Sequence, residues 1–236
     1  MKKVILLFMV SLFGMAAMAQ SKVYIYKPDG SVLTSTIATV DSISFTPPGV
    51  LINGVRWASR NVAAPGTFAT NPEDAGCFYQ WNNKEGWPAT GALGSIIATN
   101  GTTTFDQSWN GGFTTASESD TWATARDPSP AGYRVPTQAE ILTLLDDSKV
   151  TATGTTQNGV SGYKFTDIAT GNSIFLPASG LRGTTNPSYV GSHGRYWSST
   201  ASSTSTAYSL GFDRSTAGCV PDVTRANSQS IRPVAE

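Results

Sequence analysis

The side chains best suited to chemistry in this sequence lie between residues 182 and 195. Arg182, Tyr189, His193 and Arg195 occur there in a segment rich in Gly, Thr and Ser. A guanidinium presents paired donors that suit a sulfate or carboxylate, and an aromatic face suits a sugar ring. We therefore expect this segment to contribute to a glycan or polyanion site. Alternatively, the two arginines pair with carboxylates inside the domain and Tyr189 covers apolar surface.

Two tryptophans are further ligand-binding candidates. Trp87 and Trp109 stand in Gly-rich stretches, where an indole is either an exposed platform for a sugar or part of the packing. Trp57, Trp81 and Trp197 lie within apolar, strand-like segments. We expect these three to belong to the core.

Catalytic and metal-binding patterns are missing from the sequence. His193 is the only histidine, and beside glycines and Arg195 we expect an exposed loop residue rather than a general base. No nucleophile elbow, metalloprotease helix or phosphate loop is present. A calcium site needs clustered carboxylate and amide oxygens, and Trp81-Asn82-Asn83 lacks the acid. We expect no enzyme activity, no catalytic residues, no metal and no cofactor.

The ends and composition indicate export. Lys2 and Lys3 precede an apolar run that closes with Ala17-Met18-Ala19, so residues 1–19 are predicted to be a signal peptide. The run is too short to span a bilayer, and no cysteine near the cleavage point could carry a lipid. We expect a secreted or cell-surface protein without a membrane span. Basic and acidic residues number 16 each, which gives no attraction to nucleic acid.

The two cysteines, Cys77 and Cys219, are far apart in the sequence. In an oxidising compartment such a pair favours a disulfide over two free thiols. We therefore expect Cys77 and Cys219 to be bonded, which requires the segments around them to meet.

The chain divides into a small leader and a main domain. Residues 20–48 contain short β-rich runs around Pro28-Asp29-Gly30 and end in a proline-rich linker, which predicts a β-hairpin leader. A hairpin of this size is not stable alone and must pack on the main domain or on a partner. Residues 49–236 are long enough for one domain with its own core.

The main domain mixes strands, one clear helix and a long irregular stretch over 61–126. Asn53-Gly54 marks a hairpin turn, and Thr137 with Glu140 forms a capping box that opens a helix over Gln138–Asp147. Apolar alternation and turn signals predict further strands. These cover 162–168, 172–176, 194–199, 206–212 and 228–234.

Several short motifs, in order, resemble a known family. They are Trp57-Ala58-Ser59-Arg60-Asn61-Val62, Phe78-Tyr79-Gln80-Trp81-Asn82, Asp127-Pro128-Ser129-Pro130-Ala131-Gly132-Tyr133-Arg134-Val135-Pro136-Thr137 with Glu140, Leu176-Pro177-Ala178-Ser179-Gly180-Leu181-Arg182, Gly194-Arg195-Tyr196-Trp197-Ser198-Ser199-Thr200, Ala207-Tyr208-Ser209-Leu210 and Ser230-Ile231-Arg232-Pro233-Val234. Together they resemble the Fibrobacter succinogenes major paralogous domain, which is similar to the C-terminal domain of the Legionella collagen-like adhesin. The family often has cysteine where this chain has Ser129 and Pro233, so one bridge of that family is absent here.

The resemblance implies an α+β, C-type-lectin-like fold with long irregular loops and few helices. It also implies a surface protein with a role in carbohydrate binding or adhesion, a non-catalytic module for glycans, host or matrix ligands. The leader resembles hairpins found on secreted Bacteroidetes proteins. A structural role in a surface appendage is the alternative, with residues 20–48 adding a strand to another chain.

Overall fold

The computed structural model describes residues 22–26, 32–36, 48–112, 121–183, 186–213 and 215–236. The chain forms two compact units, Met1–Phe45 and Thr46–Glu236. In the first unit, β1 (Lys22–Tyr26) and β2 (Val32–Thr36) pair antiparallel as a two-stranded sheet. The expected signal peptide, 1–19, lies outside the described residues.

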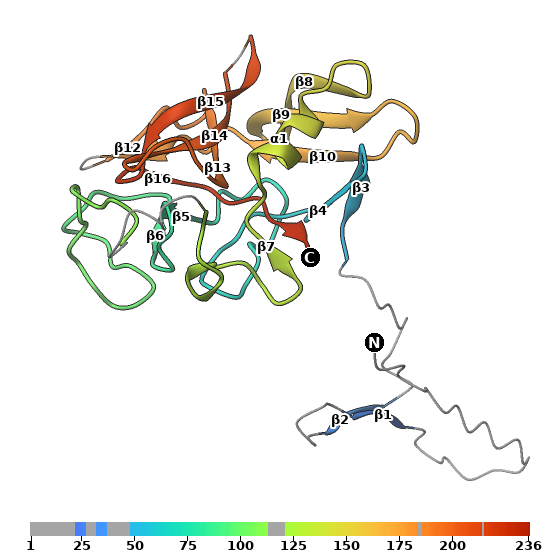
Figure 1. The fold of residues 1–236 in the computed structure, drawn as a ribbon, viewed down its shortest axis with the longest axis horizontal. Coiled ribbons are helices and arrows are strands. Elements are labelled where there is room, and N and C mark those ends of the chain that lie inside the picture. The colour runs from blue at the N-terminus through green and yellow to red at the C-terminus, as the bar shows by residue number, and fades with distance from the viewer. Residues whose placement is uncertain (1–21, 27–31, 37–47, 113–120, 184–185, 214) are drawn as a thin grey trace, which may run out of the picture. The chain divides into compact units, whose positions relative to one another are not determined.

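The regular secondary structure of the second unit consists mostly of short antiparallel sheets, which long irregular segments connect (Figure 1). Two of them are three-stranded and contain the long strands. One has the order β10 (Ser173–Pro177), β9 (Val160–Asp167), β8 (Val150–Gln157); the other has the order β13 (Gly194–Ala201), β14 (Thr206–Phe212), β15 (Ala217–Thr224).

Two further sheets join segments that are distant in the sequence. One has the order β3 (Val50–Ile52), β4 (Val55–Trp57), β17 (Val234–Ala235), β7 (Tyr133–Arg134). The other has the order β12 (Pro187–Ser188), β11 (Leu181–Arg182), β16 (Ser228–Gln229), β5 (Cys77–Gln80), β6 (Gly86–Pro88). The C-terminal strands β16 and β17 therefore pair with both early and middle segments, so they link distant parts of the second unit.

The predicted α+β, C-type-lectin-like fold class is wrong, because the fold is β-rich. Within the described residues the helical structure is α1 (Gln138–Leu144) and one short 3₁₀ turn, η3 (Thr124–Arg126). Glycine, threonine and serine are abundant, and threonine favours strands while glycine weakens helices. The composition thus supplies many short strands and turns but only one apolar helical stripe.

Helix α1 begins where the sequence predicts and ends early. Thr137 Oγ1 accepts from the Glu140 N–H at 3.2 Å, and the Thr137 N–H donates to Glu140 Oε2 at 2.8 Å, which confirms the capping box. The helix stops at Leu144 rather than Asp147. The N–H groups of Lys149 and Val150 both donate to the Asp146 carbonyl, so the chain already turns there into β8.

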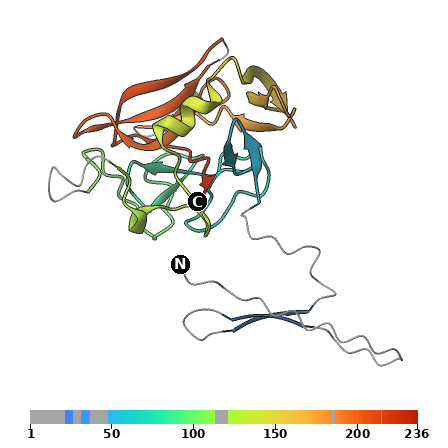
Figure 2. The ribbon, with the colours of Figure 1, turned by 45° about the vertical axis from the view of Figure 1, so that its right-hand side comes forward.

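A hydrophobic cluster fills the space between α1 and the two three-stranded sheets. The helix lies across these sheets in Figures 1 and 2, and its buried side chains are Ile141 and Leu144. They belong to one cluster with Phe165, Tyr196 and Phe212. A second cluster contains Tyr79, Trp81, Trp122 and Trp197. Trp57, Trp81 and Trp197 are fully buried, as expected from their apolar surroundings.

Candidate functional site

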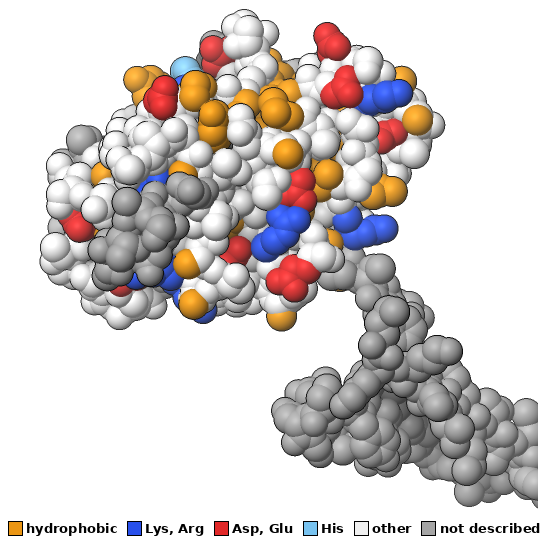
Figure 3. Space-filling view, viewed as in Figure 1, with side chains coloured by type: hydrophobic (Ala, Val, Ile, Leu, Met, Phe, Trp, Pro, Cys, Tyr) orange, Lys and Arg blue, Asp and Glu red, His pale blue; other side chains and the backbone are white. Residues whose placement is uncertain are grey.

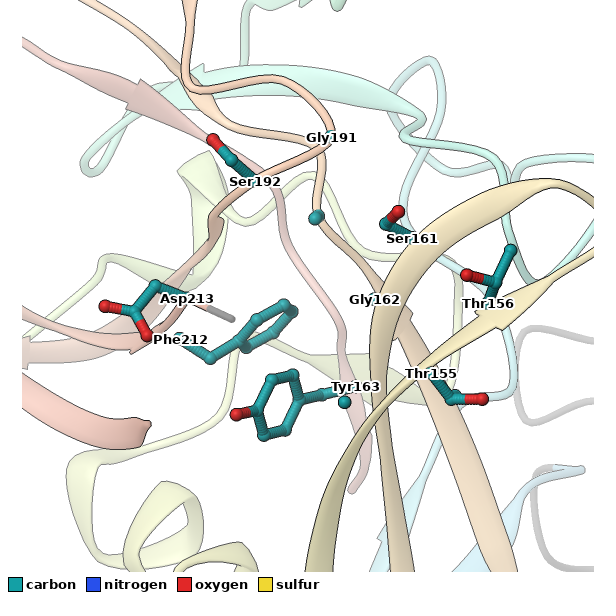
Figure 4. Close-up of a pocket in the computed structure, with 11 residues that line it drawn as sticks. Thr155, Thr156, Ser161, Gly162, Tyr163, Gly191, Ser192, Phe212 and Asp213 are labelled. Atoms are coloured by element: carbon teal, nitrogen blue, oxygen red, sulfur yellow. The ribbon is translucent and has the colours of Figure 1, made fainter. Parts of the chain in front are cut away.

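A pocket of about 240 Å³ opens where three segments of the second unit meet (Figure 4). The segments are the β8–β9 hairpin, the turn containing Gly191 and Ser192, and the end of β14. Its lining residues are Gly154, Thr155, Thr156, Ser161, Gly162, Tyr163, Ala178, Gly191, Ser192, Phe212 and Asp213. The pocket therefore combines aromatic rings, small hydroxyl side chains and one carboxylate.

Two aromatic rings form the apolar part of the pocket. The ring centroids of Tyr163 and Phe212 are 4.9 Å apart with 34° between their planes, and Figure 4 shows the rings side by side. Beside Tyr163, Gly162 permits the close approach of β10, because a Cβ there would lie 2.3 Å from the Leu176 carbonyl oxygen and 2.5 Å from the Phe175 ring. Burial, and then the charge of Asp213, raise the pKa of the Tyr163 phenol, which keeps it a neutral donor.

Asp213 supplies a permanently charged acceptor at the pocket. Its Oδ1 accepts from the N–H and Oγ of Ser215, each at 2.8 Å, and from the Thr216 N–H at 3.0 Å. These hydrogen bonds, led by the Ser215 N–H, lower the pKa of Asp213 to about 2, and His193 contributes electrostatically. The carboxylate is therefore ionised throughout the physiological range, and its hydrogen bonds among the described residues leave Oδ2 for a ligand.

The turn beside the pocket carries an exposed aromatic side chain, Tyr189, whose ring lies against that of His193. Tyr189 is 58% exposed, and its ring centroid lies 4.7 Å from that of His193. Ser192, which lines the pocket, donates through Oγ to the Tyr189 carbonyl at 2.9 Å and lies 3.0 Å from His193 Nδ1. The turn is anchored by the Gly191 N–H, which donates to the Ala178 carbonyl at 2.7 Å. Two predicted site residues, Tyr189 and His193, therefore lie together on the turn whose Gly191 and Ser192 line the pocket, although neither is itself a lining residue.

The two arginines predicted to share this site lie elsewhere. Arg182 is fully buried, and its Nη2 donates to the carbonyls of Pro88 at 3.0 Å and Gly91 at 2.9 Å. These hydrogen bonds are to backbone oxygens and not to the carboxylate of the alternative interpretation. Arg195 on β13 pairs with Gly211 on β14, and its side chain lies over that glycine. This is the face of the sheet opposite to the one that carries the Phe212 ring. Strand alternation therefore directs Arg195 away from the pocket.

The two candidate tryptophan platforms are packed. Trp87 is 1% exposed, with its ring centroid 5.2 Å from that of Phe105. Trp109 is half-buried, donates through Nε1 to the Trp81 carbonyl at 2.7 Å and carries the Arg126 guanidinium 5.8 Å from its ring. The proposal that Trp87 is an exposed sugar platform is wrong, because its indole is buried.

The disulfide expected between Cys77 and Cys219 is absent from the structure, since both are free thiols. Cys77 packs against the cluster that contains Tyr79 and Trp81. Cys219, on β15, packs against the other cluster, with Phe212. The two cysteines thus pack against different hydrophobic clusters. Burial raises the pKa of each thiol.

We predict that iodoacetamide modifies both thiols slowly in the native protein and rapidly in denaturant. Burial limits access, and the raised pKa values reduce the thiolate fraction at mildly alkaline pH. Mass spectrometry of alkylated protein without reductant measures this. A native mass two hydrogens lower, with a Cys77–Cys219 peptide, would contradict the free thiols.

The described part of the chain contains no group of three His, Cys, Asp or Glu side chains placed to hold a metal ion. A helix long and apolar enough to cross a membrane is likewise not found among those residues.

The sequence did not single out Tyr163, Ser192 or Asp213 as site residues. A glycine inside a strand often marks a close approach, so Gly162 was the available signal for the packed ring beside it. Nothing in the sequence places residues 154–163 beside 191–192 and 212–213.

A family model described as "Domain of unknown function (DUF8237)" matches residues 160–234. The matched segment contains Tyr163, the 189–193 turn and Asp213, so three parts of the candidate site lie within it. The chain matches no curated protein and no solved structure.

Proposed function

We propose that this chain is an exported, non-catalytic binding module that holds a neutral glycan at the pocket beside Tyr189. The observation that carries the proposal is the exposed Tyr189 ring next to a pocket lined by hydroxyl groups and one carboxylate. A sugar has an apolar ring face, which an aromatic ring can cover, and a rim of hydroxyl groups, which polar side chains can bind.

The pocket's polar groups suit sugar hydroxyls. Ser161, Thr155 and Thr156 lie on the hairpin side of Figure 4, with Ser192 and Asp213 on the other. A hydroxyl donates and accepts, whereas an ionised carboxylate only accepts. A sugar hydroxyl can therefore donate to Asp213 and exchange hydrogen bonds with the serine and threonine side chains.

The charges favour a neutral ligand over the polyanion that the sequence left open. Arg182 and Arg195 lie outside the pocket, while Asp213 is negative. The molecular face in Figure 3 is mostly uncharged polar surface with scattered acidic and basic side chains. A sulfated or carboxylated glycan would meet a like charge at Asp213.

The same residues argue against catalysis at this pocket. A general base works best with a pKa near the operating pH, and the hydrogen bonds to Asp213 hold its pKa at about 2. Tyr163 is shifted in the opposite direction. Both groups are thus fixed in one protonation state, which suits hydrogen bonding rather than proton transfer.

We predict that Tyr189→Ala weakens glycan binding about tenfold, the loss expected for one stacked aromatic ring. The measurement is a glycan array, followed by titration calorimetry on the best ligand. Ile168→Ala is the matched control, because Ile168 is 54% exposed and lies outside the pocket. A protein that binds no glycan, or one whose affinity survives Tyr189→Ala, would overturn the proposal.

A structural role in a surface assembly is the second candidate. The observation behind it is that β1 and β2 form a sheet of their own with two strands, and such a hairpin is marginal without a partner. In this role residues 20–48 would add strands to another chain. Deleting them, in the experiment described below, separates this role from a binding role.

A further inference from the structure

We infer that strand β8 is a self-association surface, through which two copies of this chain pair antiparallel edge to edge. Strand β8 ends the order β10-β9-β8, so on one side its backbone N–H and C=O groups have no neighbouring strand among the residues that the structure describes. In Figure 1 it lies at the outer border of the second unit. This inference does not rest on the proposed sugar binding, although Gly154, Thr155 and Thr156 of β8 also line the pocket.

The β8 edge is regular along its whole length. Its eight residues pair with β9 without a register shift, from Val150↔Asp167 to Gln157↔Val160. Thr151 to Thr156 are all exposed. The strand contains no proline, no charged residue and several β-branched side chains. A long, regularly paired, uncharged edge is a template for another strand.

The corresponding edge of the other three-stranded sheet is protected. Strand β15 has the same length but contains Pro221, which has no N–H to donate. Asp222 follows with φ at 59°, and the pairing with β14 shifts register between Ala207 and Ser209. Proline, charge and irregular pairing are the usual devices against edge pairing. Strand β8 has none of them.

Charge selects a second copy, in antiparallel orientation, as the partner. A charged edge strand would place like charges opposite each other near a two-fold axis, whereas β8 is neutral. Exposed Lys149 precedes the strand. At the other end Glu73 accepts from Asn158 Nδ2 at 2.6 Å and Gln157 Nε2 at 3.2 Å. Antiparallel pairing with Val150 opposite Gln157 of the second copy brings Lys149, together with the exposed Asp147 beside it, toward the other copy's Glu73.

The test is Thr153→Glu in the exported chain, residues 20–236. Thr153 faces Lys164 across the β8–β9 pair, so the new carboxylate finds a cation within its own chain. Two such carboxylates near a two-fold axis repel each other. Thr224→Glu is the matched control, an exposed threonine on the edge strand β15. Circular dichroism checks that both variants keep the wild-type fold.

Sedimentation velocity over a concentration series gives the result. We expect wild type and Thr224→Glu to dimerise with rising concentration and Thr153→Glu to remain monomeric. A variant lacking residues 20–48 should still dimerise. Wild type that stays monomeric at its solubility limit, Thr153→Glu that still dimerises, or a dimer lost only with residues 20–48 would each overturn the inference.

Discussion

Replacing Arg232 with methionine is expected to destabilise the second unit by about 3–5 kcal/mol, because it removes the charge-assisted hydrogen bonds of a buried guanidinium. Arg232 is 1% exposed. Its Nε donates to Asn61 Oδ1 at 2.8 Å, and its two terminal nitrogens donate to the carbonyls of Ala58 and Pro72. Methionine fills similar space but leaves these three oxygens buried without that donor.

The guanidinium is charged despite its burial. Desolvation lowers the pKa of Arg232 to about 10, which is still well above neutral pH, so the side chain donates as a cation. Of its acceptors, Ala58 and Asn61 follow strand β4, and Pro72 lies in the loop before β5. Arg232 itself lies just before β17. One side chain thus links the C-terminal segment to two early segments.

Urea unfolding of Arg232→Met measures the loss. Arg60→Met is the control, since Arg60 is half-buried, packs over Phe68 and makes one hydrogen bond of 3.3 Å, to the Thr70 carbonyl. We expect its cost to stay below about 1 kcal/mol. Similar unfolding midpoints for the two variants would contradict the role assigned to Arg232.

Gly194→Ala is expected to cost about 1–3 kcal/mol of stability and to weaken glycan binding together with it. A Cβ at position 194 would lie 2.0 Å from the nearest atom of the Phe212 ring. Phe212 is 4% exposed, packs on Tyr163 and lines the pocket. The ring must therefore move, and its movement changes the pocket floor.

Gly218→Ala is the control for this substitution. Gly218 lies in the same sheet, and a Cβ there meets nothing within 4 Å. We expect Gly194→Ala to unfold at a lower temperature than Gly218→Ala and to bind glycan more weakly in titration. If Gly194→Ala loses stability but binds glycan as tightly as wild type, the pocket beside Phe212 is not the binding site.

Local elements were the part of the fold that the sequence predicted well. The Asn53-Gly54 hairpin, the Thr137–Glu140 capping box and the strand over Thr206–Phe212 all appear as expected. Each depends on residues within a few positions of one another, because turn geometry, capping and alternation are short-range effects. The strand over 228–234 was only half right, since it is two short strands, β16 and β17, in different sheets.

The strands β8 and β15 escaped sequence-based prediction because their sequences give little alternation. Strand β8 is mostly threonine, alanine and glycine and is exposed nearly throughout, and β15 contains Gly218 and Pro221. Backbone pairing with β9 and β14 holds these segments as strands. The fold class was mistaken for a different reason, since it was inferred from the resemblance of several short motifs to a family with a C-type-lectin-like fold.

By itself the sequence determined several turns, the start of the helix and which tryptophans belong to the core, whereas its ligand-binding residues remain predictions. Only the tertiary structure decided which of those side chains face solvent together. Tyr189 and His193 lie together on the turn beside the pocket, whereas Arg182 and Trp87 are buried. The physical reason is that burial and convergence depend on pairing between segments far apart in the chain, and the residue types within one segment do not encode its partners.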